Sequence, residues 1–319
     1  MIKLPDLAAI ESAAELVYRS MQPSPQLSWP LLNERAGCEV WVKHENHNPT
    51  GAFKVRGGLV YIHHLLDREP DCAGVCAATR GNHGQSVAFA ASARGLPSVI
   101  VVPEGNSPDK NAAMKAFGAE LVIHGRDFDV ALEHARAIAG ERNLHFMPSL
   151  DANLIPGVAT YALELFRSIH QLDRIYVPIG LGSGICGVVA AKLALGLSTE
   201  IVGVVSSEAN TYALSFAAGE PVPTDSADTL ADGLAVRNPS PDALALIREE
   251  VTDVVTVTDE EVLAAIRHYF TDTHNVAEGA GAASLAALLK SNDCSGKRVG
   301  LVLTGGNNNE ALFRRALAS

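Results

Sequence analysis

Lys54 lies in a segment whose residue types could activate an amine. The segment spans residues 48–58 and reads Asn-Pro-Thr-Gly-Ala-Phe-Lys-Val-Arg-Gly-Gly. Pro49 and Gly51 predict a turn that delivers Lys54 to the start of a helix. Partial burial there, close to the cationic Arg56, would lower the pKa of the lysine and make its amine a better nucleophile. An exposed lysine at a helix start is the alternative that this segment alone leaves open.

A second segment, residues 78–85, could bind an anion through its backbone. It reads Ala-Thr-Arg-Gly-Asn-His-Gly-Gln and lies between an expected strand and an Ala-rich helix. The first N–H groups of a helix have no partner within the helix, so they can bind an anion there. A carboxylate is the expected occupant, with a further hydrogen bond from Asn82, and an ordinary capped turn is the alternative.

A third segment, residues 180–187, suits a phosphate. It reads Gly-Leu-Gly-Ser-Gly-Ile-Cys-Gly, so its backbone can approach a phosphate at the start of the next helix, with Ser183 as a further donor. The same glycines match the dinucleotide fingerprint, and Glu208 lies about 20 residues beyond it, as that motif requires. A nicotinamide-dependent oxidoreductase is therefore the alternative from another class.

The fourth segment is Thr304-Gly-Gly-Asn307, directly after an expected strand at residues 299–303. Ligands bind at the carboxyl ends of strands in open α/β sheets, so the Thr304 hydroxyl could contact one. A structural turn is the alternative.

Short β-branched runs alternate with Ala-rich helical stretches along almost the whole chain. Apolar strands separated by helices predict mostly parallel sheets covered on both faces, hence one or two open doubly wound α/β units. A closed eight-stranded barrel also fits the strand count. Strands are expected at residues 40–43, 74–77, 98–102, 121–123, 174–178, 201–205, 254–257 and 299–303.

The bulk composition excludes several classes of protein. The 319 residues carry a formal net charge of −11, which argues against a nucleic-acid surface, because phosphate backbones need clustered Lys and Arg. Acidic residues interrupt the apolar residues of the N-terminus, which predicts an amphipathic helix rather than a signal peptide, and no apolar run is long enough to span a membrane. The five cysteines are scattered, so we expect reduced thiols in a cytoplasmic protein.

Together, and in this order, the four segments resemble those of the fold type II pyridoxal-phosphate enzymes. The branch that they resemble most is that of the threonine/serine dehydratases (ammonia-lyases) and serine racemases. Thr229-Leu-Ala-Asp-Gly233 and Glu278-Gly-Ala-Gly-Ala282 support this resemblance. It implies two open doubly wound domains, like those of tryptophan synthase β: a large domain of residues 1–43 and 146–319, and a small domain of residues 44–145.

The resemblance also implies roles for single residues. Lys54 matches the lysine that forms an imine with pyridoxal 5'-phosphate, and Phe53 matches the aromatic residue beside its ring. Asn82 matches the residue at the 3-oxygen of the cofactor, Gly233 a glycine beside the ring, and Thr304 the hydroxyl at the pyridine nitrogen. The other residues that it places at the cofactor are Gly180, Gly182, Ser183, Gly184, Ile185 and Glu278, and those around the substrate carboxylate are Thr79, Arg80, Gly81, Asn82 and His83.

The activity that the resemblance implies is elimination. A hydroxyl at the pyridine nitrogen, unlike a carboxylate, holds no proton on the ring, which favours the loss of a β-leaving group. The expected reaction removes water from a β-hydroxy amino acid such as L-threonine or L-serine, giving a 2-oxo acid and ammonia, with Lys54 taking the Cα proton. A bulkier or acidic substrate (phenylserine, 3-hydroxyaspartate) and amino acid racemisation are the alternatives.

Arg80 is the largest departure from the family pattern. Serine racemases have a serine base at this place and dehydratases often have alanine, whereas an arginine is not deprotonated in a protein. We therefore expect dehydration rather than racemisation, with Arg80 binding a carboxylate or, alternatively, forming a surface ion pair. The cation ligands of the racemases find no clear match near Ser206 and Tyr212, so no metal is expected.

The resemblance alone implies a homodimer. Because little chain follows the Thr304 segment, we expect no C-terminal regulatory domain and hence a role in amino acid catabolism. Which β-hydroxy amino acid is the substrate, and which stereoisomer, the sequence leaves open.

Overall fold

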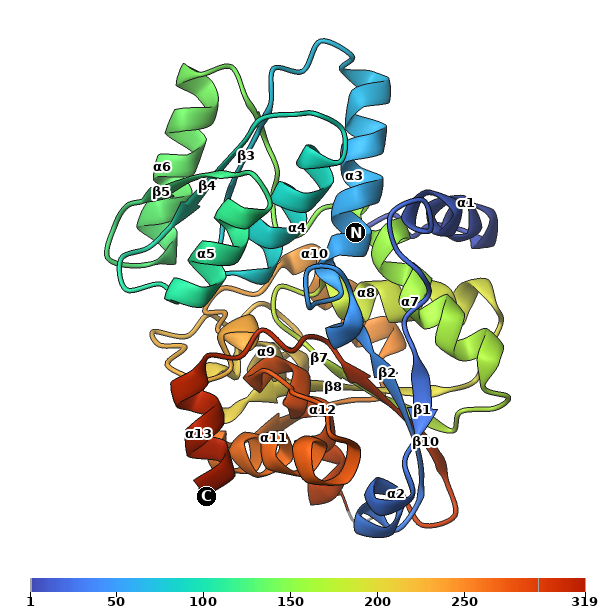
Figure 1. Cartoon of the computed structure of the whole chain (residues 1–319). Helices are drawn as coiled ribbons and strands as arrows, with labels where there is room; N and C mark the ends of the chain where they lie inside the picture. The colour runs from blue at the N-terminus through green and yellow to red at the C-terminus, as the bar shows by residue number, and fades with distance from the viewer. Residues whose placement is uncertain (1, 292, 319) are drawn as a thin grey trace.

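Two open β-sheets organise the chain in this computed structural model, which describes residues 2–291 and 293–318 (Figure 1). The larger sheet has the strand order β1-β2-β10-β7-β8-β9, and the smaller sheet has the order β5-β4-β3-β6. Neighbouring strands are parallel except β1 and β2, which are antiparallel. The larger sheet comprises β1 (Gln26–Ser28), β2 (Glu39–His44), β7 (Arg174–Pro178), β8 (Glu200–Ser206), β9 (Asp253–Val257) and β10 (Arg298–Leu303), and the smaller β3 (Val75–Ala78), β4 (Ser98–Val102), β5 (Glu120–Ile123) and β6 (His145–Phe146).

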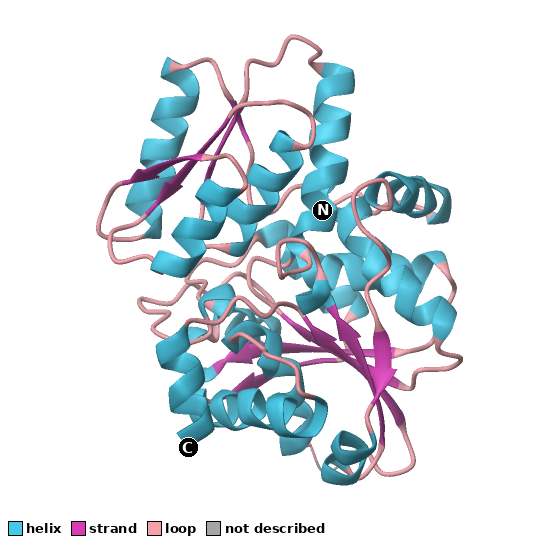
Figure 2. Ribbon diagram, in the orientation of Figure 1, coloured by secondary structure: helices cyan, strands magenta, loops and turns pink. Residues whose placement is uncertain are grey.

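Helices follow most of the strands and cover both sheets (Figure 2). They are α1 (Leu7–Val17), α2 (Pro30–Ala36), α3 (Lys54–Arg68), α4 (Asn82–Ser92), α5 (Pro108–Ala116), α6 (Phe128–Glu141), α7 (Ile155–Ser168), α8 (Ser183–Ala194), α9 (Thr211–Ala218), α10 (Pro241–Glu250), α11 (Asp259–Thr273), α12 (Gly279–Lys290) and α13 (Glu310–Ala318). Four short 3-10 turns are also present, at Glu45–His47, Ala152–Leu154, Ser207–Ala209 and Asp232–Leu234.

The smaller sheet shows why its strands are apolar at every position. Successive side chains of a strand point to opposite faces. Val75 and Ala77 of β3 pack with residues of α3 and α4, whereas Cys76 and Ala78 pack with residues of α6. Both faces are therefore buried, as a parallel sheet between helices requires.

The fold class predicted from the sequence is confirmed, and the closed barrel is wrong because each sheet has two free edges. All the expected strands are present to within a residue or two. The sequence missed β1 and β6, which are only three and two residues long. The domain boundaries at residues 43/44 and 145/146 stay a prediction. No helix of the described residues combines the length and the apolar character needed to cross a bilayer.

Candidate active site

Lys54 is the first residue of α3, as the turn at Pro49 and Gly51 predicts. Its Nζ lies 3.4 Å from the Oγ of Ser183, which is the first residue of α8, and 5.1 Å from the centroid of the Phe53 ring. Burial lowers the pKa of Lys54 from its usual 10.5 to about 8, although the nearby carboxylate of Glu278 acts to raise it. A substantial fraction of this amine is therefore neutral, and nucleophilic, near physiological pH.

The sequence wrongly assigned the lowered pKa of Lys54 to Arg56. The Arg56 guanidinium is fully buried and donates to Glu45 through Nε (2.7 Å) and to Glu164 through Nη1 (2.6 Å). Lys43 also donates to Glu164 (2.5 Å). These four residues, which we name the buried ionic cluster, neutralise one another, so Arg56 leaves desolvation as the cause of the shift at Lys54.

The predicted carboxylate loop lies at the start of α4. The buried Thr79 hydroxyl accepts hydrogen bonds from the N–H groups of Gly81 (2.8 Å) and Gly84 (3.3 Å). The backbone N–H groups of Asn82 and His83 have no acceptor within the described chain. The loop therefore offers two free donors to an anion, fewer than the sequence suggested, because Thr79 occupies the others.

The two remaining side chains of this loop differ in burial. The ring of His83 is buried, and its Nε2 lies 3.2 Å from the carbonyl oxygen of Met147. Burial, and the charge of Lys54, lower the pKa of His83 to about 4, so its ring is neutral. Arg80 is exposed, and no described residue hydrogen-bonds or forms an ion pair with its guanidinium. The surface ion pair considered for Arg80 is therefore absent from the described chain.

The glycine-rich loop leads into α8 and is shaped for close backbone approach. A Cβ at Gly180 would lie 2.2 Å from the carbonyl oxygen of Gly233, so no side chain fits there. Gly182 precedes α8 with a φ of 112°. In the described chain, no protein group accepts from the N–H groups of Ser183, Gly184 or Ile185. This helix start can bind an anion of phosphate size.

Phe53 supports the glycine-rich loop from the side. A Cβ at Gly184 would lie 3.5 Å from the Phe53 ring, which packs edge to face on Tyr161 with the ring centroids 5.9 Å apart. The Tyr161 hydroxyl donates to the carbonyl of Gly184 (2.9 Å). The lysine segment and the loop thus form one packed unit.

Thr304 follows β10 and faces the same site. Its hydroxyl finds no hydrogen-bond partner among the described residues, while its carbonyl accepts from the N–H of Phe53 (3.0 Å). An isolated β-bridge joins Ala52 to Gly305, and the N–H of Gly306 donates to Gly51 (2.9 Å). The segment before Lys54 is therefore bound to the loop after β10.

Glu278 links the lysine to the carboxylate loop. It is buried, directly precedes α12, and accepts a hydrogen bond from the Asn82 side chain (2.5 Å between Nδ2 and Oε1). Asn307 in turn donates to the Oδ1 of Asn82 (2.9 Å). Burial raises the pKa of Glu278, and the charges of Lys110 and Lys54 oppose this rise. The structure therefore brings residues from all four sequence segments together.

Sequence reasoning missed Lys110 and Asp232. The Nζ of Lys110 lies 3.0 Å from Asp232 and 3.8 Å from the second carboxylate oxygen of Glu278. The one signal in the sequence was a lysine in the first turn of a helix, where the helix dipole disfavours a cation.

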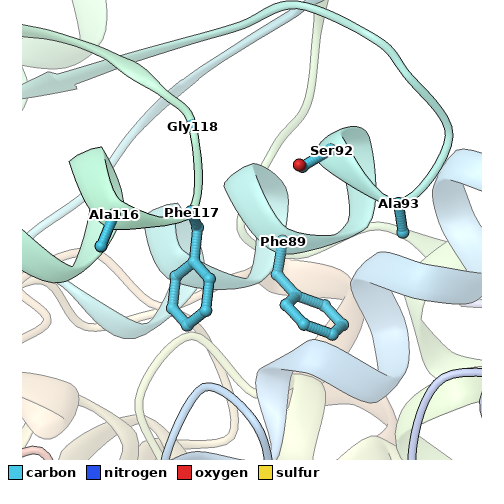
Figure 3. Close-up of a pocket in the computed structure, with 6 residues that line it drawn as sticks. All are labelled: Phe89, Ser92, Ala93, Ala116, Phe117 and Gly118. Atoms are coloured by element: carbon cyan, nitrogen blue, oxygen red, sulfur yellow. The ribbon is translucent and has the colours of Figure 1, made fainter.

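A separate surface hollow of about 330 Å³ lies at the ends of α4 and α5 and does not mark this site (Figure 3). None of its lining residues belongs to the four segments. They are Phe89, Ser92, Ala93, Ala116, Phe117 and Gly118.

The residues of the site fit pyridoxal phosphate. The glycine-rich loop has room for an anion that a Cβ at Gly180 would obstruct, and the neutral-prone amine of Lys54 lies next to it. The free Thr304 hydroxyl supplies a further polar contact. A phosphate, an aldehyde and a ring nitrogen thus each find a suitable group.

Comparison with known proteins defines the class. Residues 17–305 match the family described as "Pyridoxal-phosphate dependent enzyme". The chain therefore belongs to this family and depends on pyridoxal phosphate, which overturns the nicotinamide alternative for the glycine-rich loop.

Individual relatives narrow the comparison. The chain is 39% identical to an L-threonine ammonia-lyase of Geobacter sulfurreducens, covering 93% of this chain and 74% of the relative. It is 32% identical to an L-threo-3-hydroxyaspartate ammonia-lyase of Saccharomyces cerevisiae, covering 95% and 94%. Against two biosynthetic L-threonine dehydratases, however, the chain spans only 59% and 58% of their length.

Among solved structures, the chain resembles a bacterial-type threonine deaminase whose crystal structure is known. The TM-score is 0.89 at 31% sequence identity, over 96% of this chain and 99% of that one. This likeness confirms the fold type II architecture that the four segments predict.

Proposed function

We propose that this protein is a pyridoxal-phosphate-dependent ammonia-lyase that eliminates water from a small β-hydroxy amino acid. The observation that carries the proposal is the contact between the Lys54 amine and Ser183, 3.4 Å apart. It pairs a nucleophile of lowered pKa with a helix start whose N–H groups are free. L-threonine and L-serine are the substrates that we expect.

Pyridoxal phosphate, when bound, draws electrons from the α-carbon of an amino acid and so acidifies its Cα–H bond. We propose that Ser183, Gly184 and Ile185 bind the phosphate through their N–H groups and that Thr304 contacts the ring nitrogen. Phe53, Asn82, Gly180, Gly182, Gly233 and Glu278 complete the proposed cofactor site.

Lys54 is the proposed base. With a pKa near 8, its Nζ can accept the Cα proton at neutral pH and release it again. The free N–H groups of Asn82 and His83 would hold the substrate carboxylate, within a loop that Thr79 and Gly81 shape. The name of the Geobacter sulfurreducens relative supports L-threonine as a substrate.

The test has two steps. The purified protein is incubated with pyridoxal phosphate, reduced with borohydride and digested, and mass spectrometry should place the cofactor on Lys54. 2-Oxo acid release from L-threonine and L-serine is then measured. Lys115, which is exposed on α5, gives the control variant K115A. Cofactor on no lysine, or bound protein that releases no 2-oxo acid from any β-hydroxy amino acid, would contradict the proposal.

A second candidate substrate is an acidic β-hydroxy amino acid such as 3-hydroxyaspartate. One observation favours it: the exposed Arg80 guanidinium adjoins the carboxylate loop without an acidic partner in the described chain. The name of the Saccharomyces cerevisiae relative supports it too. R80A should then raise KM for 3-hydroxyaspartate much more than KM for L-threonine, and an equal change for both would oppose this candidate.

We also propose a cytoplasmic homodimer acting in amino acid catabolism. The cysteines Cys38, Cys72, Cys76, Cys186 and Cys294 are all free thiols, which suits a reducing compartment. Light scattering during size-exclusion chromatography measures the oligomeric state directly, and a monomeric mass would contradict the dimer.

A further inference from the structure

Lys110 is a buried cation that the proposed reaction leaves without a role. It lies in the first turn of α5, and its side chain is only 10% exposed. Burial, the positive end of the α5 dipole and the charge of Arg80 all disfavour an ammonium group there. The carboxylates of Glu278 and Asp232 outweigh them, because the pKa of Lys110 is nevertheless raised. Lys110 is therefore a cation at working pH, held by two carboxylates.

The partners of Lys110 lie in a different part of the fold. Helix α5 packs on the smaller sheet, whereas Asp232 lies in the 3-10 turn Asp232–Leu234 and Glu278 directly precedes α12, which packs on the larger sheet. Lys110 thus connects the two sheets across the site (Figure 1).

The stem of Lys110 also supports the carboxylate loop. A Cβ at Gly81 would lie 2.5 Å from the Cδ of Lys110, so the methylene groups of the lysine lie directly on the backbone of that loop. Gly81 precedes Asn82, whose side chain donates to Glu278. The loop is therefore connected to the larger sheet by the Lys110 ammonium and by the Asn82 amide.

We propose that Lys110 is a positioning residue, which holds the carboxylate loop closed over the substrate and keeps Glu278 ionised beside Lys54. The inference rests on the proposed function. Lys54 is faced by Glu278 and by His83, which is neutral at working pH. Without Lys110, Glu278 would take up a proton more readily, and the pKa of Lys54 would fall further because its one anionic neighbour would be lost.

The test uses K110M, which keeps the stem on Gly81 and removes the charge. In the apoprotein, the rate at which Lys54 attaches pyridoxal phosphate is measured against pH, because only the neutral amine reacts. We expect the midpoint for K110M to fall by about half to one pH unit. In the loaded enzyme, we expect KM for the amino acid to rise about tenfold, with kcat changed much less.

Two further variants separate positioning from mere support of the fold. K110R restores the cation and should recover most of both effects, whereas K115M, on the exposed side of α5, should match the wild type in both. If K110M fails to fold, D232N replaces it, because the side chain of Asp232 is 42% exposed; we expect the same rise in KM, at least threefold.

The outcomes distinguish this inference from the proposed function. A K110M protein that folds and has the wild-type midpoint and KM overturns the role of Lys110 alone. A loss of stability with the midpoint unchanged also overturns it. Wild-type protein that attaches no cofactor at Lys54 overturns the proposed function and the inference together.

Discussion

Two groups of charges lie on opposite sides of the segment that carries Lys54. In the buried ionic cluster, every charged group of Lys43, Glu45, Arg56 and Glu164 contacts an opposite charge within 3.0 Å. In the site, Lys54 has only a hydroxyl 3.4 Å away, and the Thr304 hydroxyl and the α8 N–H groups have no partner in the described chain.

This difference separates scaffold from chemistry. A fully paired buried cluster is expensive to disturb, because removing one member leaves another charge stranded without water. An unpaired buried polar group has a cost that the folded chain bears only where a ligand later satisfies the group. The variants below test each side of this comparison, beginning with the largest expected effect.

Replacing the unpaired amine should abolish activity while leaving the fold intact. For K54A we expect turnover to fall by about a thousandfold or more, since a general base alone contributes about 10²–10⁴. Initial-rate assays with added cofactor measure this, and circular dichroism checks the fold. Activity within tenfold of wild type would show that Lys54 is not the base.

The opposite result is expected in the buried ionic cluster. R56M strands the carboxylates of Glu45 and Glu164, and should lower the free energy of unfolding by about 3–5 kcal/mol. Urea denaturation measures it. The matched control is R142M, which breaks the exposed pair with Glu120 and should cost less than about 1 kcal/mol. Equal losses in the two variants would contradict the distinction.

The pH dependence of the apoprotein sharpens the comparison. The folded pKa of Lys54, about 8, is below its usual 10.5, so burying the cation costs stability fully below pH 8 and not at all above pH 10.5. K54M apoprotein should therefore be more stable than wild type at pH 7, by about 2 kcal/mol, and this advantage should shrink as pH rises through 8 to 10.5. Urea unfolding at about pH 7 and about pH 9.5 tests this, and a constant difference would oppose it.

The smallest effect is expected from the phosphate loop. S183A removes one hydroxyl donor but keeps the backbone N–H groups, so we expect the cofactor to bind about tenfold more weakly, or about 1.4 kcal/mol. Fluorescence titration of the apoprotein with pyridoxal phosphate measures the affinity. Unchanged affinity would mean that the backbone alone holds the phosphate.

Local sequence patterns predicted the elements and the anion-binding turns, because apolar strands and glycine-rich helix starts depend on neighbouring residues. They failed where distant contacts decide. Arg56 is two residues from Lys54, yet its side chain pairs with Glu45 and Glu164. Lys110 reads as an ordinary helix lysine, and only the fold places it beside Asp232, which is 122 residues away in sequence.

The β-bridge between Ala52 and Gly305 has a mechanical consequence. The strap before the lysine is bonded to the turn after β10, so the amine keeps a fixed distance from Thr304 even if the smaller sheet rocks. Such rocking would carry Asn82 and its neighbours toward or away from a stationary reaction centre. Opening for substrate entry and product exit could then proceed without disturbing the residue that handles the proton.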